Sequence, residues 1–379
     1  MFIVLKTIIV ECRIPKLPSR SDEVASMAKS IGYEVIGTEV QKRNRIHGST
    51  CVGPGKLTEI KKLVEDNSVQ LMIFSNALSG SKIFKIQKVL GRNVRVIDRN
   101  LLILEVFDKR AMTTEAKLQI ELARLKYTFS WGREFIRMGG LSEQIGWSGS
   151  GEYPYIDYEL EQRKRISHIE SQLKDLYRQK DSLRERRHDL GFPVVALAGY
   201  TQSGKTTLFN RLSKESKAVG LGPFTTLSTS ARRVSVQEED GYRSFFILVD
   251  SIGFIEDLHP IILNAFITTL GEIIQADLIL LVVDASDDLP MLRRKLASSR
   301  KILMETDVMS KIIICANKVD TNSEKALDNV KKEIESYFPT LPIVAISAST
   351  GKNIDKLLFL AISTLKKIGQ DQDLEKIKI

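Results

Sequence analysis

The strongest chemical signal in the chain is a phosphate-binding loop near its middle. The segment Gly199-Tyr-Thr-Gln-Ser-Gly-Lys-Thr206 fits the pattern GxxxxGK[ST], and it follows an apolar strand and opens a helix. Its glycines let backbone N–H groups turn toward phosphate oxygens, and the start of the helix adds a positive partial charge. We expect Lys205 to reach the β- and γ-phosphates of a nucleotide and Thr206 to ligate Mg²⁺.

A second signal stands at the end of a later strand. Asp250-Ser-Ile-Gly253 has the form DxxG and directly follows the apolar run 245–249. We expect Asp250 to hold Mg²⁺ through water and the N–H of Gly253 to sense the γ-phosphate. The next residue, Phe254, cannot orient a water molecule as a glutamine does, so hydrolysis should be slow unless another group supplies that function. Phe254 also suits a place in the core beneath this loop.

A third signal selects the base. Asn317-Lys-Val-Asp320 follows the strand 311–316. A carboxylate can accept hydrogen bonds from both N1–H and N2–H of guanine, which adenine does not present, so Asp320 predicts GTP rather than ATP. The N–H of Ala348, in the triplet after the last strand, would support the base. The predicted nucleotide-binding residues are therefore Gly199, Tyr200, Thr201, Gln202, Ser203, Gly204, Lys205, Thr206, Thr207, Asp250, Gly253, Asn317, Lys318, Asp320, Ser347, Ala348 and Ser349.

A threonine between the first two motifs should complete the Mg²⁺ shell when the γ-phosphate is present. The segment Gly222-Pro-Phe-Thr-Thr-Leu227 offers Thr225 and Thr226, and the residues alone do not separate them. Loss of the γ-phosphate would release this segment, which is how a nucleotide switch works.

The elements that must hold these motifs alternate between strands and helices. Apolar or β-branched runs in the second half predict strands at 192–197, 231–236, 245–250, 278–284, 311–316 and 343–347. Helical stretches separate most of them, which predicts a doubly wound α/β domain with a mostly parallel sheet. We expect a G domain at 191–367 and a polar tail at 368–379.

The first half predicts an α/β subdomain at 1–110 and a helical hairpin at 111–190. Strands are expected at 2–10, 33–40, 69–74 and 94–97, with helices near 22–30, 56–66 and 79–90. The first helix of the hairpin has Leu118, Leu122, Leu125 and Phe129 at helical spacing, and the second has a heptad seam at Ile166, Ile169, Leu173, Leu176, Leu183 and Leu190. Two helices packed separately on the α/β subdomain are the alternative.

A glycine-rich connector at 132–151 joins the two helices. Such a long loop is usually functional or disordered, and its arginines Arg133 and Arg137 could contact phosphates. Trp131 and Trp147 could supply stacking surface for bases.

The charge is unevenly distributed. Residues 1–190 hold 33 Lys and Arg against 24 Asp and Glu, whereas residues 191–379 hold 23 of each, so the net +9 belongs to the first half. A basic domain suggests a polyanionic partner, nucleic acid or an anionic membrane, and a merely soluble lysine-rich surface is an equal alternative.

Other features exclude several classes of protein. The composition, 43% hydrophobic and 27% charged over 379 residues, is that of a folded globular chain. Its three cysteines are far apart, which argues against a zinc site or a disulfide framework and suits a reducing cytoplasm. No apolar run approaches the ~18 residues of a membrane span, and the N-terminus is expected to be a strand. Gly53-Pro-Gly-Lys56 echoes a phosphate loop, but a strand-to-helix turn is favoured.

These motifs together resemble the HflX family of translation-factor-related GTPases. In the second half the match is GYTQSGKTTLFN, PFTTL, DSIGFI and NKVD. In the first half, 52–57 (VGPGKL), 96–104 and the long stretch 110–127 look like the family's N-terminal signature, so the resemblance covers roughly 1–365. A hydrophobic residue after DxxG is also typical of the family, and Phe254 matches it.

The resemblance implies a Mg²⁺-dependent GTPase that binds the large ribosomal subunit. The family's switch threonine precedes a leucine, which selects Thr226, so the expected catalytic residues are Lys205, Thr226 and Gly253 and the expected metal ligands are Thr206, Thr226 and Asp250. The chain resembles a short, archaeal-like form without the extra C-terminal domain of many bacterial members, so ribosome binding carries over better than ribosome splitting.

We therefore expect a GTP switch whose basic half docks on ribosomal RNA. The expected protein is a monomer without a membrane span, cytoplasmic and partly associated with ribosomes or a membrane surface. Two alternatives remain open at this point: a GTPase of ribosome assembly or RNA modification, and a GTP-dependent RNA-binding module with incidental turnover.

Overall fold

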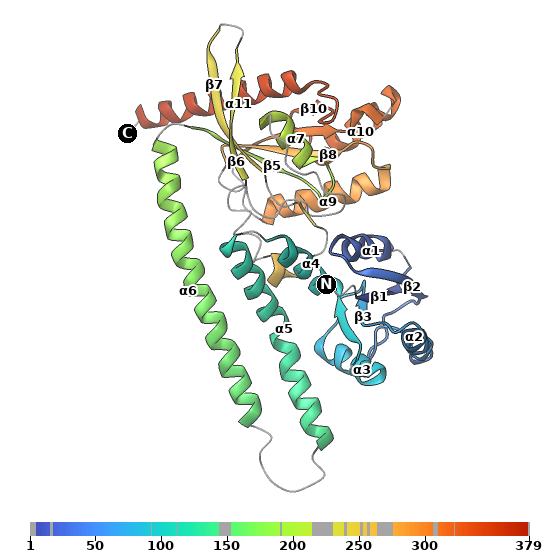
Figure 1. Cartoon of the computed structure of the whole chain (residues 1–379). Coiled ribbons are helices and arrows are strands. Elements are labelled where there is room, and N and C mark those ends of the chain that lie inside the picture. The colour runs from blue at the N-terminus through green and yellow to red at the C-terminus, as the bar shows by residue number, and fades with distance from the viewer. Residues whose placement is uncertain are drawn as a thin grey trace. The chain divides into compact units, whose positions relative to one another are not determined.

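The computed structural model describes most of the chain and divides it into two units. The described residues are 5–15, 18–91, 93–111, 113–143, 153–189, 192–213, 230–238, 241–250, 253–255, 258–263, 276–305, 310–321 and 323–377. One unit comprises Met1–Leu176 with His259–Ala265, and the other comprises Tyr177–Leu258 with Phe266–Ile379. Each unit has its own sheet (Figure 1).

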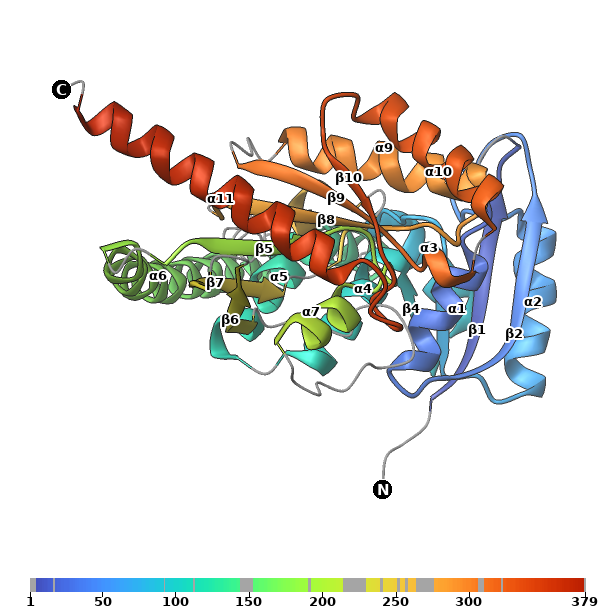
Figure 2. The same cartoon turned by 90° about the horizontal axis from the view of Figure 1, so that it is seen from above.

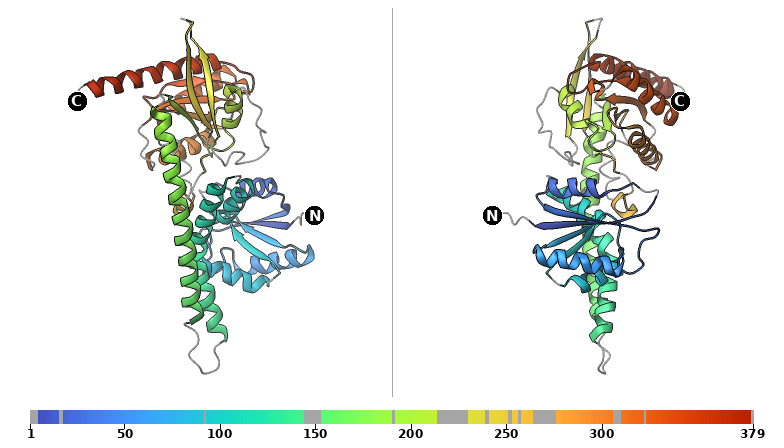
Figure 3. Two further views of the ribbon diagram at one scale, coloured as in Figure 1. Left: turned by 60° about the vertical axis from the view of Figure 1, so that its left-hand side comes forward. Right: turned by 90° about the vertical axis from the view of Figure 1, so that its right-hand side faces the viewer.

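The sheet of the first unit is wholly parallel, with the strand order β2-β1-β3-β4. Its strands are β1 (Lys6–Arg13), β2 (Glu34–Lys42), β3 (Leu71–Phe74) and β4 (Arg95–Asp98). Four helices alternate with them: α1 (Ser21–Ser30), α2 (Pro54–Asp66), α3 (Gly80–Leu90) and α4 (Arg99–Arg110). Helices α1 and α4 cover one face of the sheet and α2 and α3 cover the other (Figure 3). The predicted parallel α/β subdomain is confirmed.

The predicted antiparallel hairpin is also confirmed. Helices α5 (Thr114–Glu143) and α6 (Tyr153–Asp189) run side by side (Figures 1 and 3). Ion pairs join them, between Arg165 and Glu121 at 2.5 Å and between Lys126 and Glu170 at 2.7 Å. The predicted seam of α6 lies toward the interior, because Ile169 and Leu173 are buried, and Ile166 and Leu176 half-buried. Leu183 and Leu190 lie outside the residues whose side chains are described.

The prediction of a loop at 132–151 is wrong for residues 132–143, because these residues continue helix α5. A glycine inside a helix costs roughly 1 kcal/mol relative to alanine, and packing offsets that cost here. A Cβ at Gly132 would overlap the ring of Tyr158 on α6, so the glycine lets the two helices approach closely. Residues 144–152, including Trp147, lie outside the described residues, as do the side chains of Arg133 and Arg137.

Helix α5 uses a second face to pack on the α/β subdomain. That face is more deeply buried than the predicted leucine face, and its buried members are Ala116, Gln119, Ile120, Ala123, Tyr127 and Trp131. Trp131 is 9% exposed and meets Tyr127 edge-on, so the expectation that it offers a stacking surface is wrong. The Tyr127 hydroxyl donates to Asp98 at 2.5 Å and accepts from Asn100 at 2.9 Å, which ties α5 to the start of α4.

The second unit contains a six-stranded sheet of order β10-β9-β8-β5-β7-β6. Among the described strands only β6 is antiparallel to its neighbour, which confirms a mostly parallel, doubly wound domain. The strands are β5 (Val194–Ala198), β6 (Ser230–Gln237), β7 (Arg243–Asp250), β8 (Leu278–Asp284), β9 (Lys311–Asn317) and β10 (Ile343–Ala345).

The helices of this unit cover both faces of the sheet (Figure 2). They are α7 (Lys205–Ser213), α9 (Leu289–Glu305), α10 (Glu324–Tyr337) and α11 (Ile354–Ile377), with a short 3-10 helix at Val319–Thr321. The face under α7 and α11 buries Phe209 and Leu357, and the face under α9 and α10 buries Leu292 and Ile334. Because α11 reaches Ile377, most of the segment predicted as a tail at 368–379 continues a helix. Within the described part of the chain, no helix is long and apolar enough to cross a membrane.

Candidate functional site

The phosphate-binding loop joins β5 to α7 and depends on two glycines. Gly199 has a φ of +136°, and a Cβ there would overlap the carbonyl of Val282 on β8. Gly204 has a φ of +94°, and a Cβ there would overlap the side-chain amide of Asn317. Both positions combine a backbone conformation that favours glycine with a close approach to a neighbour. The predicted strand–loop–helix context of the P-loop is therefore present.

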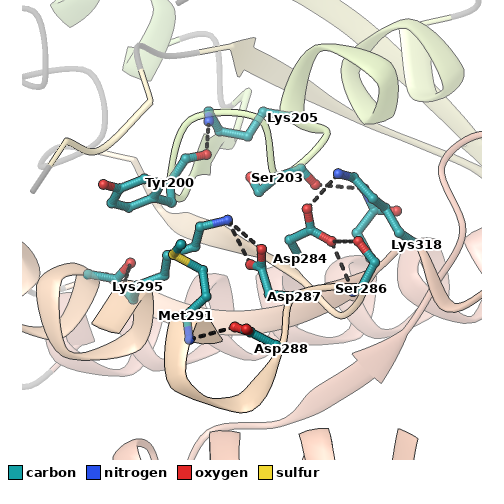
Figure 4. A network of polar contacts seen from close by, with 12 residues as sticks. Tyr200, Ser203, Lys205, Asp284, Ser286, Asp287, Asp288, Met291, Lys295 and Lys318 are labelled. Atoms are coloured by element: carbon teal, nitrogen blue, oxygen red, sulfur yellow. Dashed lines mark hydrogen bonds and ion pairs between the residues drawn. The ribbon is translucent and has the colours of Figure 1, made fainter. Parts of the chain in front are cut away.

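Lys205, the first residue of α7, is held inside this loop. Its side chain is buried, and its Nζ donates to the carbonyl oxygen of Tyr200 at 2.7 Å (Figure 4). Burial lowers the pKa of Lys205 to about 8, although the nearby carboxylate of Asp250 acts in the opposite direction. A buried ammonium group with one carbonyl partner is well prepared to accept the charge of a phosphate.

Thr206 and Asp250 bring two oxygen ligands together at the foot of the P-loop. Both residues are buried, and the Thr206 hydroxyl lies 3.4 Å from the Asp250 carboxylate. A hydroxyl and a carboxylate are hard oxygen donors of the kind Mg²⁺ prefers, so the pair fits the predicted ion. In the described part of the chain no group of three or more His, Cys, Asp or Glu gathers, so a Mg²⁺ here would depend on phosphate and water for its remaining ligands.

The DxxG segment lies against the P-loop. The N–H of Phe254 donates to the carbonyl of Gly199 at 2.8 Å, and its carbonyl accepts from the N–H of Thr201 at 3.1 Å. A Cβ on Gly253 would lie only 2.9 Å from Lys205 Nζ, so the predicted γ-phosphate sensor and the P-loop lysine are neighbours. The Phe254 side chain is 4% exposed and packs among apolar residues of the sheet, which confirms that it is a core residue.

Asn317 links the P-loop to the segment after the last strand. Its side-chain amide donates to the carbonyl of Ser203 at 2.8 Å and accepts from the N–H of Ala348 at 2.9 Å. Arg211 of α7 reaches the same segment and donates from Nε to the carbonyl of Ala348 at 3.1 Å. The Ala348 N–H, which we expected at the base, therefore already has a partner within the protein.

Asp320 and Lys318 lie just after β9, in the part of the site expected to bind the guanine base. Asp320 is exposed, and a hydrogen bond from the Ser347 hydroxyl lowers the pKa of its carboxyl group, so it is an ionised acceptor. Ser349 is exposed as well, and its hydroxyl lies 3.0 Å from that of Ser347. Lys318 forms an ion pair of 2.5 Å with Asp284 at the end of β8. The remaining P-loop residues include the exposed Gln202, with a φ of +65°, and the half-buried Thr207.

The sequence reasoning missed a polar network below the P-loop. Lys295 of α9 forms an ion pair of 2.7 Å with Asp287, and its ammonium group lies 5.4 Å from the centre of the Tyr200 ring (Figure 4). Asp284 accepts from both the backbone N–H and the hydroxyl of Ser286. Neither Asp284 nor Lys295 belongs to a short motif, so only the strand end at residue 284 could have drawn attention to this region.

The remaining residues singled out from the sequence are not placed at this site by the structure. Thr225 and Thr226 lie outside the described residues. Lys56 pairs with Glu39 at 2.7 Å and with Glu59 at 3.2 Å at the turn from β2 into α2, which favours a strand-to-helix turn over a second phosphate loop. The three cysteines are buried free thiols.

Comparison with known proteins identifies the protein family. Three family models match in succession: "GTP-binding GTPase N-terminal" over residues 19–108, "GTP-binding GTPase Middle Region" over 110–187 and "50S ribosome-binding GTPase" over 194–318. GTPase HflX of Thermofilum pendens is 40% identical over 83% of this chain and 73% of its own length. GTPase HflX of Methanocaldococcus jannaschii is 33% identical over 92% of this chain and 84% of its own length. The chain belongs to the HflX family of GTPases.

Solved structures agree with this assignment to the HflX family. The structure titled "crystal structure of SsGBP and GDP complex" is 25% identical, with a TM-score of 0.53 over 97% of this chain and 99% of that one. A GTP-binding protein of Sulfolobus solfataricus, solved with GDP, gives a TM-score of 0.50 at 25% identity over 96% of this chain and 100% of that one. As an HflX protein with an intact P-loop, the chain binds and hydrolyses GTP.

Proposed function

We propose that this GTPase is a Mg²⁺-dependent switch that binds the large ribosomal subunit through its basic N-terminal half. The convergence of Lys205, Gly253 and Asp320 on one edge of one sheet supports the GTP site, because parallel strands present their carboxyl ends together. The description of the matched family model as a 50S ribosome-binding GTPase supports the partner.

Each described residue of the site has a distinct role in this proposal. Lys205 would neutralise the β- and γ-phosphates, Asp320 would accept from the guanine base, and Asn317 holds these two ends at a fixed separation. Thr206 and Asp250 would hold Mg²⁺, with Thr226 as a third ligand. When bound, Mg²⁺ would stabilise the negative charge that develops on the phosphate oxygens.

The basic half offers specific side chains to a polyanion. Many of its cations are already paired, as Arg163 is with Glu159 on α6. Among the described residues, Lys62 on α2 and Lys85 and Lys88 on α3 are exposed and form no ion pair. Helices α2 and α3 are neighbours, so these lysines lie on one face of the first unit. We assign the first contact with ribosomal RNA to this face, the α2–α3 lysine face.

Sedimentation with large ribosomal subunits tests the partner. With a non-hydrolysable GTP analogue the protein should migrate with the subunit in a sucrose gradient, and with GDP it should remain at the top. Reversing the three lysines of the α2–α3 lysine face to glutamate should weaken binding and lower its salt dependence, since each phosphate contact contributes about 0.7–0.9 to the slope of log K against log salt. The matched control reverses Lys325, Lys332 and Lys352, which are exposed in the electrically neutral half.

Two results would argue against parts of this proposal. Equal binding with both nucleotides would mean that the nucleotide does not control the association. Equal loss in the test and control triple variants would mean that overall charge, and not the α2–α3 lysine face, carries the contact. We further propose that the protein acts in the cytoplasm and that it is a monomer. Light scattering of the purified protein can check the monomeric state.

A further inference from the structure

Hydrolysis requires a polar group that orients the attacking water, and Phe254 does not supply one. Its side chain is buried among apolar residues of the sheet, away from solvent. Another group beside the γ-phosphate position is therefore needed for this task, and a polar side chain there is a candidate. Lys205 and Gly253 locate the γ-phosphate position, because both are proposed to contact that phosphate. Their roles rest on the function proposed above.

Thr201 lies against Gly253, and the Lys205 ammonium group is close to the same point. A Cβ built on Gly253 would lie 2.8 Å from Thr201 Cγ2, 2.9 Å from Thr201 Cα and 2.9 Å from Lys205 Nζ. Thr201 is fixed there by the hydrogen bond from its own N–H to the carbonyl of Phe254 at 3.1 Å. The methyl group, packed against Gly253, and the hydroxyl share one tetrahedral carbon, so the hydroxyl lies at the edge of the same small space.

The chemistry of this hydroxyl suits a water molecule. Thr201 is half-buried, and no hydrogen bond of its hydroxyl is found within the described part of the chain. A hydroxyl can accept a hydrogen bond from water and donate one to a phosphate oxygen at the same time. Of the other polar side chains of the loop, Ser203 is buried, the Tyr200 ring lies over Lys295 (Figure 4), and Gln202 is exposed and is not among the neighbours nearest to a Cβ built on Gly253.

We propose that the Thr201 hydroxyl orients the water that attacks the γ-phosphate. In this step the water oxygen forms a bond to the γ-phosphorus, and the bond from that phosphorus to the bridging oxygen breaks and leaves GDP. Both protons of the water end on the released phosphate. Thr201 holds the water in line and keeps no proton, so its hydroxyl is needed for turnover, whereas its contribution to nucleotide binding comes from its backbone in the P-loop.

Two substitutions separate the hydroxyl from the packing. Thr201→Val keeps the branched shape against Gly253 and removes the hydroxyl, and Thr201→Ser keeps the hydroxyl and removes the methyl group. Single-turnover hydrolysis is measured at saturating GTP in the full chain, together with the affinities for GDP and a non-hydrolysable GTP analogue. We expect a rate about 10- to 100-fold lower for the valine variant, in the range seen when one transition-state hydrogen bond is lost. The serine variant should hydrolyse GTP within about threefold of the wild-type rate, and in the valine variant both nucleotide affinities should fall much less than the rate.

Three outcomes would overturn the proposal. A wild-type rate in Thr201→Val would show that the hydroxyl is not used. An equal loss in both variants would assign the effect to the methyl group and its packing. A parallel loss of nucleotide affinity would mean that Thr201 only shapes the loop. Failure of the underlying site assignment shows separately, because Lys205→Ala would then bind and hydrolyse GTP normally.

Discussion

The buried ammonium group of Lys205 predicts that nucleotide binding depends on pH. Burial lowers the pKa of this group to about 8 in the protein without nucleotide, from an ordinary value of 10.5. The negative charge of bound phosphates favours the protonated form and raises that pKa again. Binding above pH 8 therefore requires uptake of a proton, whereas binding well below pH 8 does not.

The size of the effect follows from the pKa. Affinity should be nearly constant from pH 6 to 7 and should fall about tenfold between pH 7 and pH 9, a free-energy change of about 1.4 kcal/mol. The assay is a titration with fluorescent GDP in buffers of constant ionic strength. Lys205→Arg is the control, because a guanidinium group stays charged over this range, so any slope it retains belongs to the guanine base or to other residues.

Only the slopes of the two proteins are compared, since the arginine variant is expected to bind more weakly at every pH. A wild-type affinity that follows the same pH dependence as Lys205→Arg would refute the reasoning. It would mean that the ammonium group remains charged despite its burial, with the field of Asp250 outweighing the cost of desolvation.

Three further predictions concern the base, the hairpin and the first unit. Asp320→Asn should lower the preference for GTP over ATP at least about tenfold, measured by competition binding, because an amide can present a donor where the base needs an acceptor. Gly132→Leu should lower the free energy of unfolding by about 1–3 kcal/mol in urea, because the new side chain overlaps Tyr158. Tyr127→Phe should cost about 1–3 kcal/mol in the same assay, because the buried carboxylate of Asp98 loses the hydroxyl donor, and an unchanged midpoint would contradict this.

The second half was predictable from the sequence because its information is local. Most of its strands are short apolar runs, and β8 occupies 278–284 as predicted from the run alone. Each motif stands at the end of such a strand, and the parallel sheet brings these ends to one edge. Placing Lys205, Gly253 and Asp320 at one site therefore needed only the strand order.

What the sequence could not provide depends on contacts between distant residues. Asn317 fits a base-reading motif, yet its side chain joins Ser203 to Ala348, which only the folded chain shows. Lys295 carries no motif and still lies beneath the ring of Tyr200. The first residues of the predicted connector formed a helix because Gly132 meets Tyr158, a tertiary contact that outweighs helix propensity.

The contacts around Gly253 also bear on how the site distinguishes GTP from GDP. A γ-phosphate bound by both the Lys205 ammonium group and the Gly253 N–H would lie between these two residues, and a Cβ built on Gly253 would be only 2.9 Å from Lys205 Nζ. We therefore expect GTP binding at the proposed site to displace Gly253 and to strain or break the two backbone hydrogen bonds that pair Phe254 with the P-loop. Each such bond contributes about 0.5–1.5 kcal/mol, so GTP must supply roughly 1–3 kcal/mol more than GDP to move this segment. The P-loop itself packs closely on its surroundings, because a Cβ at Gly199 would overlap the carbonyl of Val282 and a Cβ at Gly204 would overlap the side-chain amide of Asn317. The P-loop would thus bind the phosphates without moving. The segment at Gly253 and Phe254, which two backbone hydrogen bonds pair with the P-loop, would respond to the γ-phosphate.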